Sequence, residues 1–189
     1  MPQLPRPWQP AESVRIAIIS CNERETERMR TLAQFHAIGL TPVFEPYLNE
    51  CTRPENTGAH HGRIWFEKAL DDFLETSEPG FVIAEDDVDV RPAFKHALEL
   101  AVAMDVFTDF CVWRPRHHPR CLAPLIQEQR PIPPDIYQLE IPKGWYGTQC
   151  VYIPRWMAEA YTRYPDLRIR KSAFDSNLGQ LIRFENISV

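Results

Sequence analysis

The chain has 189 residues, of which 44% are hydrophobic and 25% are charged, so its composition is that of a globular protein and is too apolar for a disordered one. Its 21 basic and 26 acidic residues give a formal net charge of −5, which excludes a generally basic nucleic-acid coat but allows a local basic patch. The five cysteines are widely spaced and include no C-x-x-C pair, which argues against a disulfide framework or a thiolate zinc site. We expect a cytoplasmic protein with no membrane span, because no apolar run approaches about 18 residues and no signal-peptide core is visible.

Strand and helix patterns alternate along the first 113 residues. Residues 1–13 are rich in proline and predict an irregular lead-in, after which the apolar run Val14–Ser20 predicts a buried strand. A helix is predicted over Glu23–Ile38, where Met29, Leu32, Ala33 and His36 fall at helical spacing. By the same criteria the sequence predicts strands over Thr41–Pro46, Phe81–Ala84 and Phe107–Trp113 and helices over Gly62–Glu75 and Pro92–Met104.

The remaining third of the chain is less regular. Residues 114–143 are rich in proline, arginine and histidine and predict a long loop. A strand over Gln149–Ile153 and helices over Arg155–Tyr164 and Phe174–Leu181 follow. We therefore expect a single α/β domain over residues 14–189, either minimal or cut short at its end, with three layers around a mostly parallel central sheet.

An acidic segment, Glu85–Asp89, places four carboxylates within five residues directly after the predicted strand Phe81–Ala84. Such charges repel one another, and a divalent cation bound by oxygen ligands is the usual way to offset the repulsion. In an open α/β sheet this segment would lie at the carboxyl end of a strand, where ligands bind. Mg²⁺ or Mn²⁺ there commonly binds substrate phosphates, which predicts a phosphate or nucleotide-diphosphate substrate. The alternative is a solvated acidic turn before the helix that Pro92 opens.

Five segments follow one another in a suggestive order: IAIISCNERE, GAHHGRIWFEKAL, EDDVDV, WYGTQCVYIP and FDSNLG. This order resembles glycosyltransferases of the GT-A fold, and most closely family 25, the lipopolysaccharide-type and collagen galactosyltransferase group. The resemblance covers residues 14–182 and implies a metal-dependent enzyme that uses Mn²⁺ or Mg²⁺ and a nucleotide-sugar donor, with a UDP-sugar preferred. The acceptor would be a glycan, a protein or a modified DNA base.

The resemblance also implies roles for individual residues. Asp87 matches the metal ligand, with Asp89 as an alternative because Asp87-Val88-Asp89 also spells D-x-D. Asp175 is the candidate base that takes the acceptor's proton in an inverting mechanism, although an aspartate at that place also suits a helix cap. The residues matched to the donor side are Asn22, Glu23, Arg24, Glu85 and Asp86.

Further candidates come from residue chemistry. His61 could pair with a donor phosphate or be a loop histidine without a ligand. Arg114 and Arg116 suit a diphosphate or an anionic acceptor, and a solvated basic loop explains them equally well. Trp145 and Tyr146 could form a platform for a sugar or a base, or simply pack in the core.

Two other functions stay open. A metal-dependent phosphohydrolase or nuclease could use the same acidic segment, with His117 and His118 as the only hint of further ligands. A non-catalytic module that binds nucleotide sugars would keep the fold and the ligand without turnover.

Overall fold

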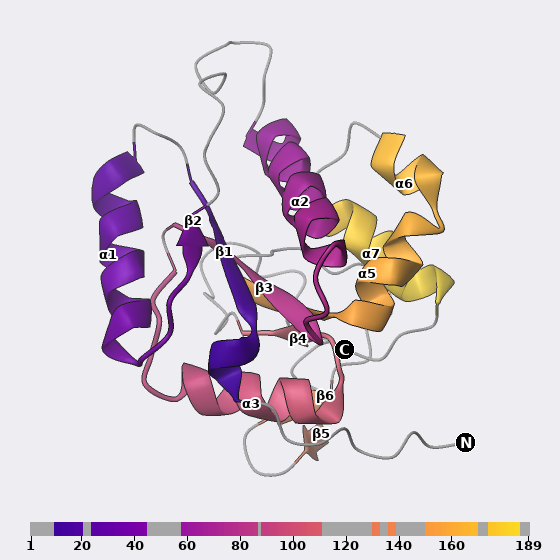
Figure 1. The fold of residues 1–189 in the computed structure, drawn as a ribbon. Helices are drawn as coiled ribbons and strands as arrows, with labels where there is room; N and C mark the ends of the chain where they lie inside the picture. Colours follow the sequence, from indigo (N-terminus) through magenta and orange to yellow (C-terminus); the bar gives the residue numbers. More distant parts are fainter. Residues whose placement is uncertain are drawn as a thin grey trace.

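The computed structural model describes residues 10–20, 24–44, 58–86, 88–110, 130–132, 136–138, 150–169 and 174–185. In chain order the elements are η1 (Ala11–Ser13), β1 (Arg15–Ile19), α1 (Glu25–Ala37), β2 (Val43–Phe44), α2 (Gly58–Leu74), β3 (Gly80–Glu85), α3 (Phe94–Met104), β4 (Thr108–Asp109), β5 (Arg130–Ile132), β6 (Ile136–Gln138), β7 (Cys150–Pro154), α5 (Arg155–Thr162), α6 (Pro165–Ile169) and α7 (Phe174–Phe184) (Figure 1). None of the helices within these ranges is long and apolar enough to cross a bilayer.

The central sheet has five strands in the order β2-β1-β3-β7-β4. β1 pairs in parallel with β2 and β3, whereas β7 pairs antiparallel with β3 and β4. The sheet is therefore mixed, and the expectation of a mostly parallel sheet holds only for the β2-β1-β3 part. The reason is that all five residues of β7 are buried, and a continuous buried run looks the same in sequence whichever way the strand points.

Helices cover both faces of this sheet and produce the expected three layers. Along β3, Phe81 and Ile83 pack into the core under α2, α5 and α7, while Val82 and Ala84 pack into the core under α1 and α3. This alternation follows from the two-residue period of a strand. Figure 1 shows α2, α5 and α7 grouped on one side of the sheet and α1 on the other.

Helix α1 presents a different face to the core from the one its apolar spacing indicates. Its buried residues are Thr31 and Phe35, whereas Met29 is 55% exposed. Phe35 contacts Phe94 of α3 edge-on, with ring centroids 5.4 Å apart. Of the four residues at helical spacing, Leu32 packs against this core, whereas Met29, Ala33 and His36 are exposed, because the inward Thr31 is not part of the apolar pattern.

Four further differences concern boundaries and connections. Helix α2 begins at Gly58, earlier than the expected Gly62. Strands β5 and β6 form an antiparallel pair within the predicted long loop, and α6 follows α5 where no helix was expected. Within the predicted irregular lead-in, η1 places Ala11 fully inside the core.

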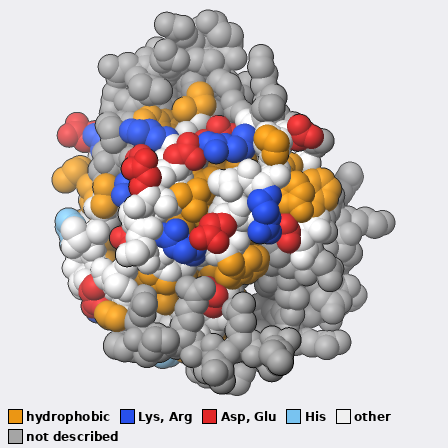
Figure 2. Space-filling view, turned by 45° about the vertical axis from the view of Figure 1, so that its right-hand side comes forward, with side chains coloured by type: hydrophobic (Ala, Val, Ile, Leu, Met, Phe, Trp, Pro, Cys, Tyr) orange, Lys and Arg blue, Asp and Glu red, His pale blue; other side chains and the backbone are white. Residues whose placement is uncertain are grey.

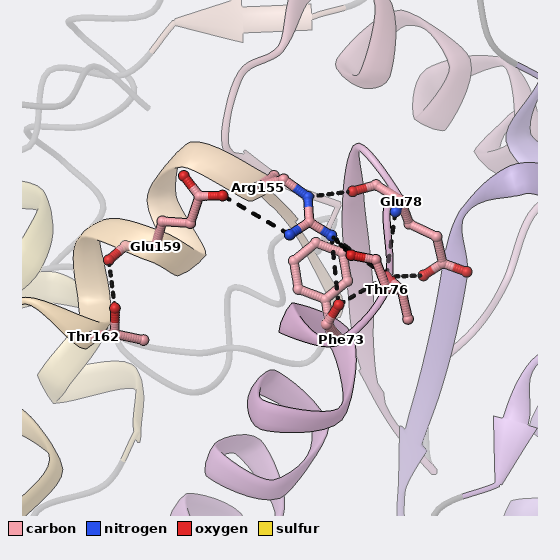
Figure 3. A network of polar contacts seen from close by, with 6 residues as sticks. All are labelled: Phe73, Thr76, Glu78, Arg155, Glu159 and Thr162. Atoms are coloured by element: carbon pink, nitrogen blue, oxygen red, sulfur yellow. Dashed lines mark hydrogen bonds and ion pairs between the residues drawn. The ribbon is translucent and has the colours of Figure 1, made fainter.

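The start of β3 is fixed by Arg155, the first residue of α5. Its guanidinium donates to the carbonyl oxygens of Glu78 through Nε and of Thr76 through Nη2, each at 2.7 Å (Figure 3). The guanidinium also lies over the Phe73 ring, 4.6 Å from its centroid. Carbonyl groups of the partly buried turn after α2 thereby gain hydrogen-bond partners.

Strands β3 and β7 approach closely at Gly80. A Cβ atom built there would lie 2.5 Å from the ring of Tyr152, a distance that real Cβ contacts do not reach. Gly80 is therefore required by the neighbouring tyrosine, since only a residue without a side chain lets the two strands pair at this point.

Candidate functional site

The carboxyl ends of β1 and β3 lie side by side. Ile19 and Glu85 are register partners, so Ser20 and Asp86, the residues that follow them, emerge next to each other. Ligands of open α/β sheets bind at this edge. The acidic segment thus lies where the sequence predicts it, at the end of a central strand.

Asp86 is buried, with 3% of its surface exposed. The Ser20 hydroxyl donates to its Oδ2 at 2.5 Å, and Nη2 of Arg24 lies 3.1 Å from its Oδ1. Both carboxylate oxygens therefore contact a donor. A buried carboxylate requires such partners, because burial without them strongly disfavours its charge.

The backbone after Asp86 is attached to α1. The Thr31 hydroxyl donates to the Asp86 carbonyl at 2.7 Å and lies 3.4 Å from the Val88 carbonyl. The Val90 amide donates to Oε1 of Gln34 at 2.7 Å. These bonds, together with the burial of Val88, hold the described parts of residues 86–90 against α1.

Asp89 differs from Asp86 in its surroundings. Its side chain is 63% exposed and lies 3.8 Å from Nη2 of the exposed Arg91. An exposed pair at that distance is weak, so the Asp89 carboxylate is accessible to a ligand. Of the three described carboxylates of this segment, Asp86 is therefore held by the protein, Glu85 is half-buried and Asp89 faces solvent.

The other predicted site residues are described only in part. Arg24 is the residue before α1 and its side chain is 42% exposed, and Glu85 is half-buried at the end of β3. His61 lies in α2 and Asp175 in the first turn of α7, but their side chains are outside the described residues. Also outside them lie Asn22, Glu23, Asp87, Arg114, Arg116, His117, His118, Trp145 and Tyr146.

The position of Asp175 bears on the alternative that the sequence left open. Because α7 begins at Phe174, Asp175 lies inside the first helical turn and not in front of it. An acid there interacts favourably with the unpaired N–H groups of the helix start. Its role as a base stays a prediction.

Ser20, Thr31 and Gln34 are site residues that the sequence analysis missed. Each binds the segment after β3 from β1 or α1. Of these three, only Thr31 could have been found from the sequence, because a polar residue on the buried side of a helix needs a hydrogen-bond partner.

Among the described residues, no group of three or more His, Cys, Asp or Glu side chains converges. Carboxylate oxygens are nevertheless the ligands that Mg²⁺ and Mn²⁺ prefer, and the exposed Asp89 is available to bind one. Asp86 does not fit as a ligand, because Ser20 and Arg24 contact its two oxygens.

Outside the acidic segment, the described residues include a buried thiol. Cys150 of β7 is buried, and burial raises the pKa of its thiol, with the Asp109 charge adding to the effect. The thiol is therefore neutral at physiological pH and unsuited to nucleophilic chemistry.

Figure 2 shows acidic and basic side chains intermixed on the described part of one face. Among the described residues, Arg168 pairs with Asp71 and Arg163 pairs with Glu185.

Comparisons of the chain with protein-family models, with curated proteins and with solved structures find no significant match.

Proposed function

We propose that the protein is a metal-dependent glycosyltransferase of GT-A-like fold, which moves a sugar from a nucleotide-diphosphate donor to an acceptor hydroxyl. The observation that supports it best is the position of Glu85 and Asp86 at the end of β3, beside the end of the parallel strand β1. A central parallel strand that leads into carboxylates at the ligand-binding edge suits a substrate that carries both phosphate and metal.

Residues of the acidic segment would hold the metal. Asp87 is the first choice from the sequence, and Asp89 presents an accessible carboxylate. Bound Mn²⁺ or Mg²⁺ would offset the negative charge of the departing diphosphate. In this proposal the exposed carboxylate of Asp89, with Asp87, binds the cation, and Asp86 does not bind it.

The donor would lie along the carboxyl ends of β1 and β3. Arg24 lies beside Asp86 and its side chain is 42% exposed, so it is the described cation best placed for a phosphate group. Asn22, Glu23 and His61 complete the proposed donor side, and a UDP-sugar is the preferred donor.

The acceptor side depends on the later part of the chain. Asp175 is proposed to take the proton of the acceptor hydroxyl as the sugar carbon is attacked. Arg114 and Arg116 are proposed to contact phosphate or an anionic acceptor, and Trp145 and Tyr146 to stack on a sugar or base. A glycan, a protein or a modified DNA base would each supply a hydroxyl.

The test is turnover of nucleotide sugars with and without Mn²⁺, alongside a generic phosphodiester and a phosphomonoester. Metal-dependent loss of the sugar from a UDP-sugar supports the proposal. Cleavage of the phosphoesters alone would identify a phosphohydrolase, and donor binding without turnover would identify a binding module. The variant Asp175→Asn should abolish transfer and leave donor binding unchanged if Asp175 is the base.

A further inference from the structure

We propose that Asp86 is a buried anchor, not a ligand, and that its contacts with Ser20 and Arg24 hold the neighbouring carboxylates in the position that binds metal. The first half of this proposal concerns the protein alone. The second half rests on the proposed function, since it assumes a cation at the acidic segment.

Asp86 acts as an anchor because it is buried and both of its carboxylate oxygens contact a donor. Asp86 is 3% exposed and Ser20 is 4% exposed, so their 2.5 Å hydrogen bond lies away from water, where such bonds are strongest. Arg24 adds a positive charge 3.1 Å from the second oxygen. A cation seeking this carboxylate would have to displace both partners.

Backbone hydrogen bonds to α1 connect Asp86 to the rest of the acidic segment. The carboxylate of Asp86 contacts Ser20 and Arg24, and its backbone carbonyl accepts a hydrogen bond from Thr31. Four positions further along, the amide of Val90 donates to Gln34. Asp89 lies between these attachment points and is exposed, so the direction of its carboxylate depends on them. Outer partners that orient metal ligands act in this way.

Charge and positioning predict opposite effects for Arg24, which makes the proposal testable. Removing a positive charge next to a cation site should tighten metal binding if electrostatics alone mattered. Removing a positioning contact should loosen it. Ser20→Ala changes no charge and therefore tests positioning by itself.

The first experiment measures unfolding by urea without metal, for the parent, Ser20→Ala, Asp86→Asn and the double variant. We expect the two changes to be coupled by about tenfold in the unfolding equilibrium constant. Additive effects would overturn the anchor, whatever the function of the protein. Ser13→Ala serves as the matched control, because its hydroxyl donates to Pro10 at an exposed site, and it should be additive with Asp86→Asn.

The second experiment titrates the intact folded chain with Mn²⁺ alone, by calorimetry or electron spin resonance. Ser20→Ala and Arg24→Gln should weaken binding by about tenfold with the stoichiometry retained, and Arg24→Lys should recover part of the loss. Arg155→Gln is the matched arginine control on the other side of the sheet and should bind Mn²⁺ like the parent. Unchanged or tighter binding in Ser20→Ala and Arg24→Gln would overturn the positioning role. If the parent itself binds no Mn²⁺, the proposed function and the positioning role both fail, while the unfolding cycle still decides whether Asp86 is an anchor.

Discussion

The two ends of β3 are each held by an arginine, and the two arginines have different partners. At the start of the strand, Arg155 is bound to main-chain carbonyls, and its side chain is 20% exposed. At the end of the strand, Arg24 is bound to the buried carboxylate of Asp86, and its side chain is 42% exposed. Carbonyl groups in a turn need donors in any fold. The fold does not require a buried carboxylate beside an arginine, because a buried ion pair adds little to stability compared with apolar packing.

We therefore expect the start of β3 to matter for stability and the exposed side chains after its end to matter for the proposed ligand binding. Changes at Gly80 and Arg155 should lower stability and leave ligand binding alone. A change at the exposed carboxylate of Asp89 should do the reverse. The predictions below test that separation.

The largest effect on stability is expected at Gly80. Gly80→Ala would place its methyl group against the Tyr152 ring and should lower the free energy of unfolding by roughly 2–3 kcal/mol, the cost of overpacking a tight core. Urea unfolding measures the change. The double variant Gly80→Ala, Tyr152→Leu should recover part of the loss because the ring is gone; no recovery would show that the clash is not its cause.

Arg155 should follow. Arg155→Gln removes donors from the Thr76 and Glu78 carbonyls and the contact with Phe73, and it should cost about 2 kcal/mol, as for two or three lost hydrogen bonds. Arg155→Lys should restore little, since a single ammonium cannot reproduce the planar fork. Mn²⁺ affinity should not change in either variant. A loss of metal affinity here would contradict the separation between the two ends of β3.

The smallest effect on stability and the largest on binding are expected at Asp89. Asp89→Asn changes an exposed side chain, so the free energy of unfolding should move by no more than about 0.5 kcal/mol. Stabilisation by Mn²⁺ with a UDP-sugar should nevertheless fall in Asp89→Asn, because a neutral oxygen is a poorer ligand for a hard cation. The loss should be complete if Asp87 and Asp89 bind the cation together and partial if Asp87 binds it without Asp89. Thermal melting with and without the two ligands measures both properties. Full ligand stabilisation in this variant would remove Asp89 from the site.

Much of the fold was predictable because apolar runs and periodicity depend on local sequence. The strands at Arg15–Ile19, Gly80–Glu85 and Cys150–Pro154 and the helices that begin at Arg155 and Phe174 lie where the pattern predicts them. The direction of β7 was not predictable, because direction depends on which strands it joins. The buried side of α1 was also missed, since it depends on the bonds that Thr31 makes to residues after β3.

The position of the candidate site was predictable from the sequence, but which of its carboxylates are buried and which are exposed was not. Four carboxylates after an apolar strand indicate a charged edge of the sheet. That Asp86 is buried while Asp89 is exposed depends on Ser20, which lies 66 positions away in the sequence. Only the pairing of β1 with β3 brings these residues together.

The acidic edge beside β1 and β3 is proposed to bind a nucleotide sugar through a divalent cation. The most direct measurement is the melting temperature of the parent chain with Mn²⁺ alone, with UDP-sugars alone and with both, repeated for Asp87→Asn. A ligand that binds only the folded state raises the melting temperature, so the account predicts a shift that requires both ligands and that Asp87→Asn abolishes. A parent chain that shows no metal-dependent shift with any nucleotide sugar would contradict the account.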